Sequence, residues 1–270
     1  MYQPFVLLVI GLLATVSAPD SEPRTTTAPK PVAAAKKPAT KAAARPAAVS
    51  AAAARTQRFL QRVNLAPLLR FNPASGTAGV MNGFYSYDYW RLEVVLTAVQ
   101  RDAKNPGLYH VRGKSRRHRK VTPLSGTIRF TEVALLPRPS ASDLPYQPWQ
   151  PATVSGSFTL QETGGRRGTF SGDIDVDVAP DPERKVRVWC CAADNETRGG
   201  GILFEGQWRL GAERVPVIWK DDIFSLARNI LTDFEIGSRD VEINRKYSRR
   251  GWDTYWENEE WWAERPVARR

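Results

Sequence analysis

A six-residue phrase with glycine in second place occurs four times in this sequence, and it constrains the fold more than any other feature. Each copy continues polar, apolar, polar, apolar, and the copies start at Ser125, Ser155, Ser171 and Glu205. Alternation with a period of two predicts a β-strand with one buried face. Glycine within a strand suits a bulge or a sharp bend, where a side chain would clash. The phrase therefore predicts a β protein with strongly coiled strands.

Eight runs of this alternating kind follow one another, separated by short clusters of Gly, Pro, Asn and Asp. They cover residues 83–101, 108–116, 121–136, 152–162, 167–178, 185–192, 201–210 and 214–219. Short connections predict antiparallel hairpins, and no intervening segment is long and periodic enough for a crossover helix. The predicted fold class is all-β, an eight-stranded antiparallel meander barrel, with a β-sandwich as the alternative.

The same alternation predicts which side chains face the interior. The predicted inward residues are Leu92, Val94, Leu96, Ile128, Phe130, Phe158, Leu160, Ile174, Val176, Val178, Val186, Val188, Trp208, Leu210, Val215, Val217 and Trp219. The opposite face is mostly Arg, Glu, Thr and Asp. A polar outer face disfavours an outer-membrane barrel, whose lipid-facing side is apolar.

The amino terminus has the features of a targeting segment. An apolar run from Phe5 to Val16 has the length of a signal-peptide core, and small residues up to Ala18 suit cleavage. We therefore expect residues 1–18 to be a signal peptide and the protein to be periplasmic or secreted, with no membrane span after cleavage. The alternative is an uncleaved segment that anchors the chain in a membrane.

The next segment has the composition of a linker. Residues 19–55 are mainly Ala, Pro, Lys, Arg, Val and Thr, and without aromatic residues such a segment cannot bury enough area to fold. Residues 19–58 hold eight Lys or Arg against two acidic residues, which is +6 of the net charge of +11. We interpret 19–55 as a disordered tether, although a basic arm is also drawn to phosphate-rich surfaces.

The remaining organisation follows from where the alternation starts and stops. We expect a short helix and lead-in at 56–82, the barrel at 83–220, and a carboxy-terminal helix and Trp-rich tail at 221–270. The apolar spacing from Ile223 to Leu231 after two aspartates predicts the helix. Thr254 and Glu257 fit a capping box that would open a second short helix.

Four of the nine tryptophans lie in this tail, at positions 252, 256, 261 and 262. The first interpretation is that they clamp the tail onto the domain, because large exposed apolar patches are uncommon on monomers. The alternative is a surface that binds a partner or stacks on carbohydrate.

The sequence offers little catalytic chemistry. It has two histidines, His110 and His118, and lacks the nucleophile-elbow, P-loop and H-E-x-x-H motifs. The cations between the two histidines should lower the proton affinity of both. The adjacent Cys190 and Cys191 point to opposite faces of a strand, so they should not form a disulfide, and two thiols fall short of a zinc site. We predict no enzyme activity, no metal and no cofactor.

The hairpin between the histidines concentrates positive charge. Its candidate anion-binding residues are Arg112, Lys114, Arg116, Arg117, Arg119 and Lys120. They lack the interleaved aromatic residues that stack nucleic-acid bases, so specific nucleic-acid binding is not expected. Asp173, Asp175 and Asp177 alternate along one strand and are interpreted as an ordinary solvent-facing row.

Gly83-Phe84-Tyr85 opens the array, and the strand meander and a helix follow it. In this order the chain resembles the calycin or lipocalin family over residues 80–231, although that family's opening motif has Trp where this chain has Tyr85. The resemblance implies a barrel that holds a small ligand. The layout is also similar to that of exported Bacteroidota proteins of unknown function, which implies no activity.

Two functions follow as hypotheses. The first is an exported, non-enzymatic binding protein that holds a small apolar ligand or a partner at the barrel mouth. The ligand-lining residues would be Trp90, Leu92, Phe130, Phe158 and Trp208. The second is a structural or interaction protein with a filled barrel, which engages a protein partner through its Trp-rich tail.

Overall fold

The computed structural model describes residues 44–72, 79–137, 150–164, 167–180, 185–189, 196–237, 239–257 and 260–263. All of them belong to one compact unit, residues 42–270.

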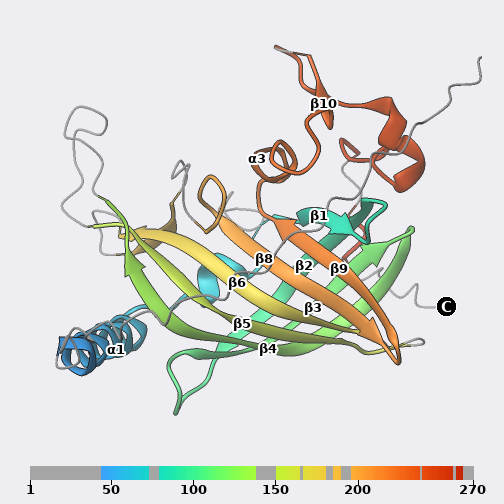
Figure 1. Ribbon diagram of the computed structural model, residues 1–270. Helices are drawn as coiled ribbons and strands as arrows, with labels where there is room; N and C mark the ends of the chain where they lie inside the picture. Colours follow the sequence, from blue (N-terminus) through green and yellow to red (C-terminus); the bar gives the residue numbers. More distant parts are fainter. Residues whose placement is uncertain are drawn as a thin grey trace, which may run out of the picture. The chain divides into compact units, whose positions relative to one another are not determined.

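The core of this unit is a closed antiparallel barrel of eight strands (Figure 1). Its strands are β1 (Met81–Tyr85), β2 (Trp90–Arg101), β3 (Leu108–Arg117), β4 (Lys120–Leu135), β5 (Ala152–Glu162), β6 (Thr169–Pro180), β8 (Ile202–Leu210) and β9 (Glu213–Lys220). Each pairs with the next along this order, and β9 pairs with β1 to close the barrel. The all-β barrel is confirmed, and closure excludes the sandwich alternative.

The eight strands are not the eight runs read from the sequence. The first run divides into β1 and β2, because residues 86–89 form a turn in which Ser86 and Tyr89 have positive φ. Within residues 185–189, the described part of the run at 185–192, the chain forms β7 (Val186–Val188), which pairs with the end of β6 and lies outside the closed circle. The predicted number was correct, but two of its members were assigned wrongly.

The four glycine-led phrases lie in β4, β5, β6 and β8, and their glycines face inward. A Cβ at Gly172 would lie 2.1 Å from the backbone oxygen of Glu205, and one at Gly126 would lie 2.0 Å from that of Thr159. Adjacent strands therefore approach too closely here for any side chain. This confirms the prediction that the glycines permit tight coiling, which an eight-stranded barrel requires.

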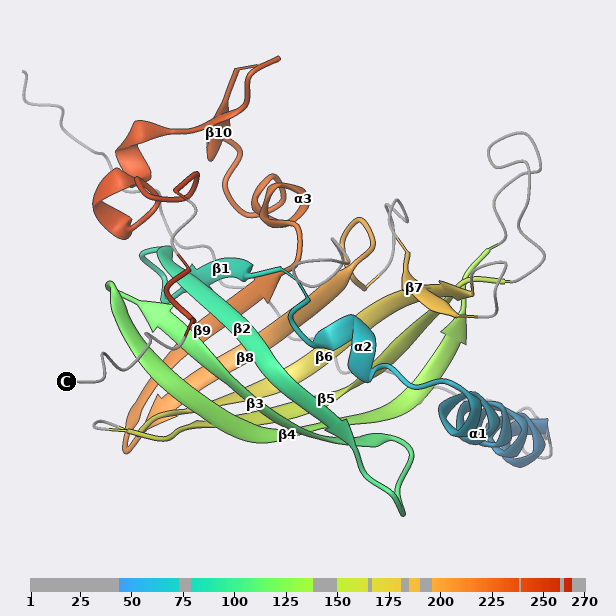
Figure 2. The same ribbon diagram turned by 180° about the vertical axis from the view of Figure 1, so that it is seen from behind.

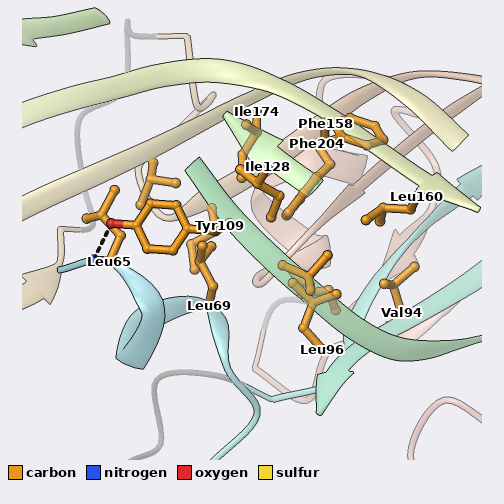
Figure 3. Close-up of a cluster of buried hydrophobic side chains, with 14 of the residues drawn as sticks. Leu65, Leu69, Val94, Leu96, Tyr109, Ile128, Phe158, Leu160, Ile174 and Phe204 are labelled. Carbon is orange, nitrogen blue, oxygen red and sulfur yellow. Dashed lines mark hydrogen bonds between the residues drawn. The ribbon is translucent and has the colours of Figure 1, made fainter. Parts of the chain in front are cut away.

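The inward side chains form one apolar core (Figure 3). All of the predicted inward residues either belong to this core or pack against it. At its centre the Trp219 ring stacks on Phe204, with centroids 4.9 Å apart, and meets Phe158 edge-on at 5.1 Å. Eight strands enclose just enough space for side chains to fill, as they do here.

A short helix within residues 56–82, the range expected to hold a short helix and lead-in, completes this core. Helix α2 (Ala66–Leu69) packs against β2 and β7 (Figure 2). Leu65, Leu68 and Leu69 are buried. The Leu65 backbone N–H donates to the Tyr109 hydroxyl at 3.1 Å, the dashed bond in Figure 3. The lead-in to the barrel is thus part of its core.

Helix α1 (Ala44–Arg62) precedes α2 and packs on β4. It begins inside the range 19–55 for which the composition predicts a linker, and its run of alanines, the best helix formers, accounts for this. Thr56 is buried and its hydroxyl accepts the Val133 backbone N–H at 3.1 Å. Within the described residues, none of the helices combines the length and the hydropathy needed to cross a bilayer.

After β9 the chain forms a second apolar cluster on the outside of the barrel. It contains α3 (Ile223–Ala227), the small pair β10 (Glu235–Ile236) and β11 (Glu242–Ile243), and the 3-10 helix η1 (Arg245–Arg250). The Asp222 carboxylate caps α3 by accepting the Phe224 N–H at 3.1 Å. Phe84 of β1 and Leu203 of β8 point outward into this cluster, where they meet Phe234 and Trp252.

The second helix predicted in the tail was wrong for the part of it that the structure describes. Residues 251–256 form turns, and the Thr254 backbone oxygen accepts the Glu257 N–H at 3.2 Å without a helix following. Packing of the tail rings against the barrel decides this segment, so the local capping pattern is overridden.

Candidate binding groove

One candidate site is a groove of about 690 Å³ between the outer face of β1 to β3 and the tail, here called the outer groove. The lead-in and the barrel contribute Phe71, Gly79, Val80, Asn82, Arg91, Glu93 and Arg116, and the tail contributes Tyr255, Trp256, Glu257, Glu260, Trp261 and Trp262. Its volume lies within the range of about 300–1,000 Å³ that is usual for ligand sites.

Strand register brings the polar residues of the groove floor together. Glu93 on β2 is the cross-strand partner of Asn82 on β1 and of Arg116 on β3. Arg91 lies two residues before Glu93, so it shares the same face. Three neighbouring strands thus place four polar side chains in one patch.

Two buried arginines share one buried glutamate in this patch. Arg116 donates two hydrogen bonds to the Glu93 carboxylate, from Nε to Oε2 at 2.5 Å and from Nη2 to Oε1 at 2.8 Å. Arg91 Nη2 forms an ion pair with Glu93 Oε1 at 2.9 Å. Arg91 Nε also donates to the Asn82 side-chain oxygen at 3.0 Å. These charges are 5–8 % exposed, and such burial is tolerable only because each charge is paired. We call the three charged residues the floor triad.

The tail covers the triad with aromatic rings and backbone oxygens. The Arg91 guanidinium lies 5.2 Å from the Tyr255 ring centroid, and that of Arg116 lies 5.2 Å from the Trp261 ring. Arg91 Nη1 also reaches the Gly251 backbone oxygen at 3.4 Å and the Thr254 hydroxyl at 3.3 Å. Burial raises the pKa of Tyr255, which keeps its phenol neutral.

Trp256 differs from the other groove aromatics because it is 63 % exposed. One face stacks on Phe224, with centroids 5.7 Å apart and planes inclined by 21°. Tyr255 meets it edge-on at 4.8 Å. An indole supported by two rings loses little rotamer freedom on binding a ligand, so it suits stacking.

The groove is nearly balanced in charge. Arg91 and Arg116 face Glu93 within the triad, and Glu257 and Glu260 also line the groove. The three carboxylates and two guanidinium groups favour neither a strong anion nor a strong cation. They offer many hydrogen-bonding atoms beside aromatic faces.

The five predicted ligand-lining residues belong to the barrel core. Leu92, Phe130, Phe158 and Trp208 are buried in it, and Trp90 packs against it. Their inward placement is as predicted, but their neighbours are other core side chains. Whether they contact a ligand stays a prediction.

The six predicted anion-binding residues do not form one surface. Arg112, Arg119 and Lys120 are exposed, and Arg119 pairs with Asp253 at 3.0 Å. Arg116 belongs to the floor triad, and Lys114 Nζ donates to the Trp262 backbone oxygen at 2.6 Å. Arg117 has the opposite parity and points into the barrel, so anion binding by the six residues as a set stays a prediction.

Arg117 forms a buried pair near one end of the barrel. Its Nη2 donates to both carboxylate oxygens of Glu162, at 2.7 and 2.9 Å, and Glu162 is fully buried. The Trp208 indole N–H and the Gly168 N–H donate to the same carboxylate at 3.0 and 3.1 Å. These four bonds occupy the Glu162 carboxylate and leave it no room for a substrate, while the buried Arg117 Nε has no hydrogen-bond partner among the described residues.

Other chemistry-bearing residues have structural surroundings. Both histidine side chains are exposed to solvent. The part of the His118 ring that is covered, followed by the Arg117 charge, lowers the pKa of His118, which is the predicted direction. The solvent-facing prediction was wrong for Asp177, which is buried and accepts the Thr153 and Thr197 hydroxyls, both at 2.7 Å. Cys190 and Cys191 lie outside the described residues. Among those residues, no three His, Cys, Asp or Glu side chains group closely enough to hold a metal.

No family model, curated protein or solved structure matches this chain.

Sequence reasoning missed the outer groove for a definite reason. Arg91 and Glu93 alternate with apolar residues, and Arg116 lies in a run of polar and basic residues; both patterns are also typical of solvent-facing positions. The available signal was the concentration of tryptophans in the tail, because so many large rings require a surface to cover. That signal does not identify which strands of the barrel the rings cover.

Proposed function

We propose that this chain is a non-enzymatic binding protein whose ligand occupies the outer groove. The barrel fold is compatible with such a role. The observation that carries the proposal is the supported, exposed Trp256 at the side of a groove whose floor contains paired charges.

The ligand class that fits this chemistry is a polyhydroxylated molecule of carbohydrate type. Its apolar C–H face would stack on Trp256, and its hydroxyl groups would meet polar atoms such as those of Asn82 and Glu260. A nearly balanced groove offers little to a multiply charged ligand. Stacking with polar contacts around it is a general basis for sites of this size.

Binding is favoured over catalysis because the groove has no poised base in its floor. The Glu93 carboxylate accepts hydrogen bonds from both arginines, which occupy the lone pairs that a general base would use. We therefore retain the expectation of a protein without enzyme activity.

The packed interior favours a filled barrel over a ligand cup. Leu92, Phe158 and Trp208 are at most 2 % exposed, and all three belong to the single apolar core inside the barrel. A ligand inside would have to displace these side chains, with loss of their burial free energy. We accordingly place the proposed site outside the barrel.

The test is to apply the purified protein to an array of neutral and acidic oligosaccharides and to titrate the best binders by tryptophan fluorescence. We expect neutral glycans to bind and Trp256→Ala to weaken binding about tenfold or more, since one stacked ring contributes about 1–2 kcal/mol. Tyr87→Ala is the matched control, because Tyr87 is 81 % exposed and does not line the groove.

An array without binders would contradict the ligand class. Equal losses for Trp256→Ala and Tyr87→Ala would contradict the site. If deletion of residues 251–270 left the barrel folded but abolished capture of a specific protein, the tail would serve a protein partner instead.

A further inference from the structure

The positive charge of this chain is concentrated before the barrel. Between Pro23 and Tyr87 there is no Asp or Glu, whereas ten Lys or Arg occur there, so this stretch carries +10 of the net +11. The rest of the chain is therefore close to neutral. Such asymmetry indicates a charged surface as the partner of this segment.

Helix α1 presents part of this charge on one fixed face. Arg55, Arg58 and Arg62 are exposed and follow one another at spacings of three and four, which places them along one side of the helix. We call these three residues the arginine stripe. No ion pair of the described residues includes them.

An adjoining face of α1 fastens the helix to the barrel. Thr56 and Leu60 are buried, and Phe59 and Val63 pack against the barrel core. The Leu60 backbone oxygen also accepts a hydrogen bond from Arg101 of β2. The stripe thus has a fixed orientation on the folded domain, unlike charges on a free tail.

We propose that the arginine stripe docks this protein on an anionic lipid bilayer. Guanidinium groups form paired hydrogen bonds with phosphate oxygens, and a row of them along a helix matches a plane of headgroups. Lipid is favoured over nucleic acid because residues 23–58 contain no aromatic residue on which a base could stack, and Phe59, the one aromatic residue between Arg55 and Arg62, packs against the barrel core. The proposal is independent of the outer groove.

The surface contribution of each charge sets the expected size of the effect. One Lys or Arg near an anionic bilayer increases partitioning about fivefold, and salt screens this attraction over about 10 Å at moderate ionic strength. Removal of the three stripe charges should therefore weaken binding about 100-fold.

The test is sedimentation with vesicles of phosphatidylcholine alone or mixed with phosphatidylglycerol, at low and high salt. The protein is used as isolated, with its amino terminus determined by mass spectrometry. The test variant is Arg55→Gln/Arg58→Gln/Arg62→Gln. The matched control is Arg167→Gln/Arg209→Gln/Arg214→Gln, which removes three exposed arginines of the barrel loops and strands.

We expect salt-sensitive binding to the mixed vesicles, a large loss for the stripe variant and little loss for the control. Unfolding curves of both variants should match that of the parent, because the substituted side chains are exposed. Equal losses for the two variants would show net charge alone to be responsible and would overturn the stripe. Equal binding to both kinds of vesicle would overturn the electrostatic basis, and stripe-dependent binding to duplex DNA or RNA without vesicle binding would overturn lipid as the partner.

Discussion

Strand β1 and the adjoining ends of β2 and β3 are buried on both faces, but the two faces are buried in different ways. On the inner face, Leu92 and Val94 join an apolar core enclosed by the barrel itself. On the outer face, Arg91 and Glu93 are buried to a similar degree beneath the tail and depend on pairing with each other. The inner face is stabilised by the removal of apolar surface from water. The outer face is stabilised by hydrogen-bonded charges, and removal of one charge of a pair lowers the free energy of unfolding.

This difference teaches that the burial of a strand's outer face depends on what packs against it. Along β1 the outward Phe84 meets the rings of the second cluster, while its neighbour Asn82 meets the triad. One covering segment therefore creates an apolar patch and a polar groove side by side.

The largest expected effect comes from the inner face of the barrel wall, at Gly172 of β6. Gly172→Ala places a methyl group 2.1 Å from the Glu205 backbone oxygen, and backbone cannot move aside cheaply in a closed barrel. We expect a loss of about 4 kcal/mol or more in the free energy of unfolding, measured by urea denaturation.

Gly164→Ala is the matched control for that substitution, because the nearest heavy atom to its new methyl group would be Pro123 Cδ at 3.9 Å. It should alter stability by about 0.5 kcal/mol or less. Similar stability of the two variants would refute close strand approach as the reason for the inward glycines.

The next effect concerns the outer face. Glu93→Gln leaves two buried guanidinium groups without their carboxylate, so we expect unfolding to become about 3–5 kcal/mol easier. Glu205→Gln is the control, since Glu205 pairs with Arg198 at 2.6 Å in an exposed position and should contribute about 1 kcal/mol at most. A small loss at Glu93 would mean that the triad is well hydrated.

A smaller effect should separate the tail from the barrel. Trp252→Phe removes the indole bond to the Tyr89 backbone oxygen, 3.1 Å long, and some packing volume, for a loss of about 1–2 kcal/mol. Hydrogen exchange should quicken in residues 223–257 and stay unchanged in β4 and β5. Trp256→Phe should leave both regions unaffected, and uniform quickening after Trp252→Phe would contradict two separable clusters.

The smallest effect is a dependence on pH. The folded pKa of His118 is lowered from 6.5, first by burial and then by Arg117, so protonation disfavours the folded state. Stability should decline as pH falls below 6.5 towards the folded pKa and should level off beneath it. An NMR titration measures that pKa directly. His118→Gln should remove this part of the decline while His110→Gln keeps it, and a His118 pKa above 6.5 would contradict the prediction.

The sequence predicted the barrel well because its inner face follows a local rule. Leu160 and Trp208 are inward because of parity alone, and parity does not depend on the rest of the chain. The assignment of individual strands was less secure. The turn at 86–89 contains non-glycine residues with positive φ, which the sequence does not announce. The alternation at 185–192 does not show that β7 pairs only with the end of β6 among the described strands. Asp177 was misread because the loop that supplies Thr197 is distant in sequence.

The sequence by itself determined a set of coiled strands, the side chains of these strands that face inward, and the charge asymmetry before them. Each of these depends only on neighbouring residues. The tertiary structure alone decided that Arg91, Glu93 and Arg116 would be buried together, and that Trp252 would be enclosed while Trp256 stayed exposed. These outcomes require a tail to fold back over strands that lie more than a hundred residues earlier in the chain. Burial and charge pairing at such a site arise from contacts that no local pattern encodes.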